Sequence, residues 1–151
     1  MIDSQEFEVR FIAPGETWPI RASVLWPEKD PGPECALDGD DDVSTFHLGA
    51  IFRGEVVSIG TFMKAEQPHY SGVLAYRLRA MGTSSGHQGE GCGAAVIEKA
   101  LEVLSAQGVE RFWCDARHVA LGFYARQNWD IVGPTYEVPL RGPHRRAFRL
   151  I

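Results

Sequence analysis

The most chemically suggestive part of the chain is a glycine-rich segment at residues 82–93, which reads GTSSGHQGEGCG. Five of the chain's 16 glycines lie in it. The segment falls between a predicted strand and the start of a long predicted helix. At such a junction, unpaired N–H groups and the positive helix end attract an anion, and absent side chains let phosphates reach the backbone. The segment therefore predicts a phosphate-binding loop.

Two common phosphate motifs fit this loop poorly. The spacing from Gly86 to Gly91 is that of a Walker A loop, but Cys92 and Gly93 replace the lysine and hydroxyl that grip phosphate and magnesium. A dinucleotide fingerprint is met only loosely, and it should follow the first strand of a βαβ unit, whereas several predicted strands precede this loop. Nucleotide binding is therefore the weakest interpretation.

A third pattern, Q-x-x-G-x-G, fits residues 88–93 and resembles the pyrophosphate loop of the GNAT superfamily of acyl-CoA-dependent acyltransferases. The preceding residues 79–83 resemble the strand that pairs with the cofactor's pantetheine arm in that superfamily. The Phe123-Tyr124 pair within residues 122–129 resembles the superfamily's "FY" pair near the thioester sulfur. Residues 21–27 and 142–144 also look like one branch of small bacterial members. The resemblance covers nearly the whole chain.

The resemblance implies an N-acetyltransferase in which an amine attacks the thioester of acetyl-CoA directly. Acetyl-CoA is the implied co-substrate, and the implied partner is an amine on an unidentified small molecule or protein. Tyr124 is the implied general acid, which protonates the departing thiolate. The implied cofactor-binding residues are Met81, Gly82, Thr83, Gln88, Gly89, Glu90, Gly91, Cys92, Gly93 and Ala94.

Several alternatives stay open at these positions. Tyr124 on spacing alone would be a core aromatic, and Cys92 is interpreted as a small filler residue rather than a nucleophile. Asp115 stands where relatives often have asparagine, and Trp129 where they have phenylalanine. The general base is not identified; the candidates are Glu55, Glu137, His118 and His144. A non-catalytic acyl-CoA-binding module is the alternative function.

Hydrophobic periodicity predicts the elements that position these residues. Strands are expected over 7–13, 45–52, 56–64, 73–82, 109–115, 129–138 and 144–151, with helices between 17 and 27, over 91–107 and over 120–127. We therefore expect an α+β protein with a mixed, mostly antiparallel sheet of about six or seven strands and about three or four helices. In the GNAT-like fold that the resemblance implies, two splayed central strands hold the acyl-CoA.

Length, charge and cysteine content narrow the class of protein. At 151 residues, the chain is expected to be a single domain spanning 1–151. Its net charge of −5 disfavours nucleic acid and anionic membranes, and no apolar run is long enough to span a bilayer. Three cysteines outside C-x-x-C spacing, and no signal-peptide pattern, favour the cytoplasm. A homodimer is also considered.

The acidic segment 27–42 is interpreted as a solvated loop. Its Asp38-x-Asp40-x-Asp42 spacing resembles a calcium loop, but Val43 and Gly49 stand where glycine and glutamate are required. The histidines and cysteines show no metal-ligand spacing, so no metal is expected.

Overall fold

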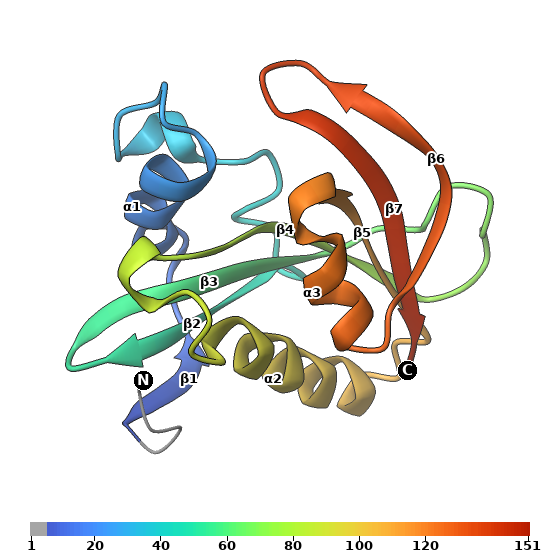
Figure 1. Ribbon diagram of the computed structural model, residues 1–151. Coiled ribbons are helices and arrows are strands. Elements are labelled where there is room, and N and C mark those ends of the chain that lie inside the picture. The colour runs from blue at the N-terminus through green and yellow to red at the C-terminus, as the bar shows by residue number, and fades with distance from the viewer. Residues whose placement is uncertain (1–5) are drawn as a thin grey trace. The chain divides into compact units, whose positions relative to one another are not determined.

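The computed structural model describes residues 6–151, and its contacts divide the chain into two compact units (Figure 1). The first unit comprises the described residues up to Met63 together with Leu78–Val103, and the second comprises Lys64–Arg77 and Leu104–Ile151. Strand β4 contributes residues to both units.

The order of elements agrees with the prediction. The strands are β1 (Phe7–Phe11), β2 (Phe46–Phe52), β3 (Glu55–Lys64), β4 (Ala75–Thr83), β5 (Arg111–Arg117), β6 (Asp130–Val138) and β7 (Gly142–Leu150). The α-helices are α1 (Trp18–Ile20), α2 (Cys92–Ala106) and α3 (Leu121–Arg126). The strands are hydrogen bonded in the order β1-β2-β3-β4-β5-β7-β6, and β4–β5 is a parallel pair. The predicted α+β class with a mostly antiparallel sheet is confirmed.

In the first unit, β1, β2 and β3 pair antiparallel around a tight β2–β3 turn. The turn residues Arg53 and Gly54 both have positive φ, 50° and 81°. This is the two-residue turn whose twist matches that of the flanking strands, and it fixes their register. Side chains of β2, of β3, of α1 and of the residue that follows β1 build a small apolar core. Its buried members are Ile12, Ile20, Ile51 and Ile59.

The first helical segment differs in detail from the prediction. It begins at Pro14 rather than at Thr17, and α1 lies between a short 3₁₀ turn and a π-helical turn that ends at Leu25. Thr17 is the N-cap residue of α1, but its hydroxyl donates to the Pro14 carbonyl at 2.6 Å and caps no helix N–H. The Glu16 carboxylate instead accepts from the Ala13 N–H at 2.6 Å, because that backbone donor precedes the helix and needs a partner.

In the second unit, β5 pairs antiparallel with β7, which pairs with β6 in a long curved hairpin (Figure 1). Successive β5 side chains point to opposite faces of the sheet. On one face, the Phe112 ring packs at a tilt against the Trp129 ring with 4.7 Å between ring centres, and the Tyr124 ring of α3 packs against the same ring at 5.0 Å. The other face carries Trp113 and Asp115. Among residues 6–151, no helix is long and apolar enough to cross a bilayer.

Candidate active site

The glycine-rich loop of the first unit needs glycine for its backbone conformation. Gly89 and Gly91 have φ of 79° and 88°, a region that residues with a Cβ rarely adopt. A Cβ at either position would meet open space, so backbone conformation rather than crowding demands glycine. The loop is held at its start by Gln88, whose side-chain amide donates to the Thr83 carbonyl at 3.1 Å.

Helix α2 begins directly after this loop. Its first hydrogen bond joins the Ala95 N–H to the Gly91 carbonyl at 3.0 Å. The N–H groups of Cys92, Gly93 and Ala94 therefore precede the intrahelical ladder and remain available to an anion. Cys92 and Gly93 are buried, whereas Gly89 and Gly91 are exposed. The chain thus presents backbone donors and bare backbone in the same segment, as a pyrophosphate requires.

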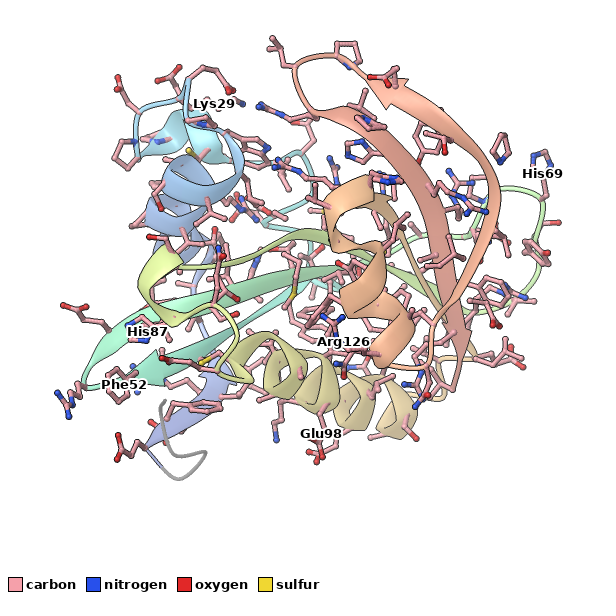
Figure 2. The ribbon with its side chains drawn as sticks, viewed as in Figure 1. Lys29, Phe52, His69, His87, Glu98 and Arg126 are labelled. Atoms are coloured by element: carbon pink, nitrogen blue, oxygen red, sulfur yellow. The ribbon has the colours of Figure 1, made fainter. Side chains whose placement is uncertain are left out.

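One carboxylate lies in the loop. The Glu90 carboxylate contacts the His87 imidazole at 3.2 Å, and the His87 ring lies 5.3 Å from the Phe52 ring, beside which it is seen in Figure 2. The Glu90 side chain is thereby tied to His87. Burial raises the pKa of the Cys92 thiol, and the nearby Glu90 charge raises it further. A neutral, buried thiol fits the interpretation of Cys92 as a filler residue better than that of a nucleophile.

Strand β4 carries a backbone irregularity just before the residues expected to bind the pantetheine. Ala80 has φ of 52°, which is unusual for a residue with a side chain inside a strand. Such conformations interrupt a strand's regular alternation and redirect its backbone groups. In the following residues, the Ser58 hydroxyl bonds to the Thr83 hydroxyl at 2.8 Å and donates to the Gly82 carbonyl at 3.3 Å.

Tyr124, in the second unit, is buried with an exposed fraction of 5%. Its ring packs against Phe123 at 5.2 Å and Trp129 at 5.0 Å. Burial raises the pKa of Tyr124 well above its ordinary value, and the neighbouring Cys114, to which the hydroxyl donates a hydrogen bond, raises it further. Burial likewise raises the pKa of Cys114. The phenol is therefore held protonated, and its neighbours fix its position.

The parallel pairing of β4 with β5 covers three residue pairs and ends at Arg77 and Trp113. Strand β5 nevertheless continues to Arg117, and its residues from Cys114 onward pair with β7 on the other side. Tyr124 is hydrogen bonded to the first residue beyond this end, Cys114. Tyr124, the general acid that the resemblance implies, thus contacts β5 just past the end of its pairing with β4.

Asp115 is the centre of a cluster that sequence reasoning missed. Its carboxylate accepts from Arg146 Nε at 3.0 Å and Nη2 at 2.8 Å, from Arg77 Nη2 at 2.9 Å, and from the Tyr136 hydroxyl. Burial alone would raise the pKa of Asp115, but the Tyr136 and Arg146 hydrogen bonds and both guanidinium charges outweigh it, so this pKa is lowered. Burial and the Asp115 carboxylate raise the pKa of Tyr136 to about 12.

The four candidates for the general base differ in their surroundings. Glu55, Glu137 and His118 are exposed, whereas His144 is buried and packs against the Tyr136 ring at 6.1 Å. The His144 Nδ1 lies 2.9 Å from the Gly142 carbonyl. A carbonyl oxygen only accepts, so Nδ1 carries the proton of this contact, and a neutral imidazole then has its lone pair on Nε2.

The acidic loop is only partly the solvated segment that was expected. Asp40 is buried, and its two carboxylate oxygens accept from Arg21 at 2.7 and 3.0 Å. Arg21 also donates to the Cys35 carbonyl and the Thr61 hydroxyl. Although burial raises the pKa of Asp40, the hydrogen bonds from Arg21 and Leu37 outweigh it and lower this pKa. The surrounding acids Asp38, Asp41 and Asp42 are exposed as predicted.

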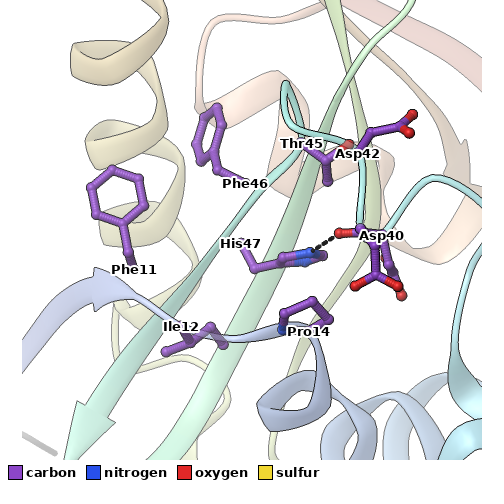
Figure 3. A pocket seen from close by; sticks show the side chains of 9 residues that line it. Phe11, Ile12, Pro14, Asp40, Asp42, Thr45, Phe46 and His47 are labelled. Carbon is purple, nitrogen blue, oxygen red and sulfur yellow. Dashed lines mark hydrogen bonds between the residues drawn. The ribbon is translucent and has the colours of Figure 1, made fainter.

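A shallow pocket of about 320 Å³ lies beside Asp40 in the first unit (Figure 3). His47 lines it, with Nε2 bonded to the Asp40 carbonyl at 3.1 Å and Nδ1 to the Thr61 hydroxyl at 2.7 Å. Phe11 and Phe46 border it on the other side. The Asp40 and His47 side chains that line it are therefore already hydrogen bonded, whereas Asp41 and Asp42 are exposed. In the part of the chain that the structure describes, no group of three acidic, histidine or cysteine side chains could hold a metal.

Comparison with known proteins agrees with this architecture. Residues 11–129 match the model of the acetyltransferase (GNAT) family. A protein of Bacillus subtilis (strain 168), named as the uncharacterized N-acetyltransferase YitI, is 34% identical over 137 residues, which cover 91% of each chain.

Solved structures show the same fold. Ard1 from Thermoplasma volcanium has a TM-score of 0.77 at 14% identity, covering 97% of this chain and 98% of its own. An aminoglycoside 6'-N-acetyltransferase complexed with coenzyme A has a TM-score of 0.73 at 12% identity, covering 95% and 96% of the two chains. At these identities, the likeness concerns the fold alone.

The family match spans well over half of the chain, and the YitI match spans nearly all of it. The strand order, the glycine loop at the start of α2 and the early end of the β4–β5 pairing agree with the fold that the sequence predicted. The chain belongs to the GNAT family of acetyltransferases and is an enzyme of the acyltransferase class.

Proposed function

We propose that this enzyme transfers an acetyl group from acetyl-CoA to a primary amine by direct attack. The observation that carries the proposal is the loop at the start of α2, in which Gly89 and Gly91 adopt left-handed conformations. Bare backbone followed by unpaired N–H groups suits the pyrophosphate of a coenzyme A thioester. The aminoglycoside acetyltransferase of the same fold, which was solved with coenzyme A, supports this assignment.

In the proposed site, residues 88–94 hold the pyrophosphate through backbone donors, and residues 81–83 of β4 hold the pantetheine. A backbone-built anion site is consistent with the net charge of −5, because it needs no basic side chains. Exclusion of water around these donors strengthens their interaction with the ligand. Acetyl-CoA supplies an activated thioester, and binding two reactants together supplies much of the rate.

The chemical step forms a bond between the amine nitrogen and the thioester carbonyl carbon and breaks the bond from that carbon to sulfur. The nitrogen loses a proton, and the departing thiolate gains one. We assign the second transfer to the Tyr124 hydroxyl, which is protonated at neutral pH; because its pKa is raised, the transfer depends on the position of the hydroxyl rather than on its acidity. The tyrosinate is a strong base and regains its proton from water or from the reacting amine.

The amine must be uncharged to attack. Among the four candidates for the base, we favour His144, because its Nδ1 contact leaves the Nε2 lone pair to accept a proton. Asp115 is unsuited to the role, since two guanidiniums and the Tyr136 hydroxyl occupy its carboxylate.

Substitution of Tyr124 by Phe separates an enzyme from a non-catalytic acyl-CoA-binding module. The ring would keep its packing against Trp129 and lose only the hydroxyl. We expect Y124F to bind acetyl-CoA with unchanged affinity by calorimetry while losing about 10²–10⁴-fold in kcat, the usual contribution of a positioned acid. Phe123→Leu is the matched control for packing. Wild-type protein that binds acetyl-CoA but never releases thiol with any amine would favour the binding module.

Ligand selectivity gives a second test. Acetyl-CoA should raise the melting temperature of the protein, and ATP and NAD should not. Stabilisation by ATP without stabilisation by acetyl-CoA would contradict the assignment of the loop.

We further propose a cytoplasmic enzyme that acts as one domain over 1–151. Cys35, Cys92 and Cys114 are free and buried, which suits a reducing compartment, and the family match includes residues of both units. The homodimer stays a prediction, which light scattering of the purified protein tests.

A further inference from the structure

The Asp115 cluster carries more positive than negative charge. Arg77 and Arg146 share one carboxylate, and Tyr136 contributes a neutral hydroxyl. The two guanidiniums and the carboxylate therefore sum to one positive charge. The Arg77 and Arg146 side chains are 30% and 25% exposed, against 17% for Asp115. The carboxylate is therefore more deeply covered than the two cationic side chains.

Both arginines have N–H donors to spare. Arg77 bonds to Asp115 through Nη2 alone, and its buried Nε has no hydrogen-bond partner among the described residues. Arg146 uses Nε and Nη2. A guanidinium has five N–H donors in a planar fork that matches a carboxylate. Because the Arg77 Nε is covered by the protein, only the remaining terminal N–H groups of the two guanidiniums could reach a ligand.

The arginines are also held rigidly. Each guanidinium carbon lies 5.1 Å from the centre of the Trp113 ring, and the Trp113 indole N–H donates to the Ala65 carbonyl at 2.8 Å. The indole therefore fixes both cations, which reduces the conformational entropy that a ligand would cost them. A pair of cations ordered in this way is pre-organised to bind an anion.

The cluster lies at the end of the β4–β5 pairing. Arg77 and Trp113 form the last residue pair of that ladder. The next residue of β5, Cys114, accepts the Tyr124 hydrogen bond, and Asp115 follows it on the opposite face of the strand. His144 and Arg146 lie on the same face as Asp115, since Arg146 is its cross-strand partner. The cationic pair thus lies one residue from the position bonded to the proposed acid.

We propose that the acceptor carries a carboxylate as well as its amine, and that Arg77 and Arg146 bind that carboxylate. The proposal rests on the proposed acetyl transfer and narrows its acceptor to amino acids or to peptides that present such a group. A purely cationic acceptor such as a polyamine is disfavoured, because Asp115 already has its partners and the cluster would repel a second cation.

The first test compares acceptors that differ only in the carboxylate. Free amino acids and their carboxamides are assayed with acetyl-CoA by thiol release, and peptides with a free or amidated C-terminus form a second pair. The amide's amine is less basic, so intrinsic reactivity at neutral pH favours the amide. We expect kcat/KM to favour the acid by about 10–100-fold, the effect of one or two charge-assisted hydrogen bonds. If the free amino acids show the larger preference for the acid over the amide, the acceptor is an amino acid; if the peptides do, the acceptor is a peptide.

The second test uses variants and needs no turnover. N-acetylated amino acids, the expected products, and their amides are titrated into the protein by calorimetry. The wild type should bind the acids at least tenfold more tightly, and Arg146→Gln and Arg77→Lys should lose this preference. Arg145→Gln removes a charge from the neighbouring β7 position, where Arg145 bonds to the Gly133 carbonyl, and should keep it. Unchanged acetyl-CoA affinity and circular dichroism verify the fold of each variant.

The outcomes separate the two proposals. Acids and amides that are equal both as acceptors and as ligands would overturn the carboxylate site and leave acetyl transfer standing. The same holds if the acid preference survives in Arg146→Gln and in Arg77→Lys. If no amine releases thiol, acetyl transfer fails, and the titration of N-acetylated acids against amides still decides whether the arginine pair binds a carboxylate.

Discussion

The buried ion pair between Arg21 and Asp40 gives a prediction about stability. The Arg21 side chain is fully buried and that of Asp40 is 4% exposed. Arg21 makes four hydrogen bonds through its two terminal nitrogens, and Asp40 also accepts from the Leu37 N–H at 2.9 Å. Asp40→Ala would leave the guanidinium buried without its counter-charge, and this loss costs about 3–5 kcal/mol.

That cost is a large part of a typical domain stability of about 5–15 kcal/mol. For a chain of this length it corresponds to a lowering of the melting temperature on the order of 10 °C. The measurement is urea unfolding followed by circular dichroism, together with a thermal scan. Asp38→Ala is the matched control, because Asp38 is an exposed acid of the same loop and should change the free energy of unfolding by less than about 0.5 kcal/mol.

A double-mutant cycle isolates the pair itself. The cycle compares Arg21→Met, Asp40→Leu and the two together; because the double variant removes both charges, it should recover much of the stability that Asp40→Leu alone loses. Asp40→Ala and Asp38→Ala with equal effects, or a double variant that equals the sum of the single ones, would refute the reasoning that an unpaired buried charge is the cause.

Three further predictions follow from the same structure. Gly91→Ala should weaken acetyl-CoA binding about tenfold by calorimetry, because a left-handed conformation costs an alanine about 1–2 kcal/mol. The control Gly86→Ala should bind acetyl-CoA normally, and equal affinity of both variants would contradict the role of the loop. The folded protein should react with iodoacetamide far more slowly than the urea-unfolded protein, because burial covers all three thiols and raises the pKa of Cys92 and Cys114; rapid labelling of native Cys92 would oppose its role as a filler. The lowered pKa values of Asp40 and Asp115 stabilise the protein above the unfolded carboxyl pKa of about 3.9, and this stability is lost as the pH falls through the folded values. The free energy of unfolding of the wild type should therefore drop below about pH 4, and Asp40→Asn should show a shallower drop. Identical pH profiles would contradict this linkage.

The sequence was sufficient for features that local patterns encode. Alternating apolar residues located the strands, and the glycine pattern of residues 82–93 located a loop whose left-handed Gly89 and Gly91 the structure displays. The two-residue turn at Arg53-Gly54 is similarly local. In each case the residues that determine the conformation are neighbours in the chain.

Long-range polar pairs were beyond the reach of such patterns. Arg21 contacts Asp40 across 19 positions, and Asp115 contacts Arg77 and Arg146 across 38 and 31. The partners of Asp115 depend on strand register, and that of Arg21 on the path of a loop, neither of which a single sequence specifies. The three arginines at 145, 146 and 149 of the last predicted strand were the available signal that basic side chains lie along β7.

The most direct test of the central claim is acetyl transfer itself. Wild-type protein is incubated with acetyl-CoA and a panel of amines, amino acids and peptides, thiol release is followed, and the acceptor is weighed by mass spectrometry. We predict thiol release that depends on an amine, an acceptor heavier by one acetyl group, and loss of both in Y124F despite retained acetyl-CoA binding. Acetyl-CoA binding with no acetylated product from any acceptor, or full activity of Y124F, would contradict the account.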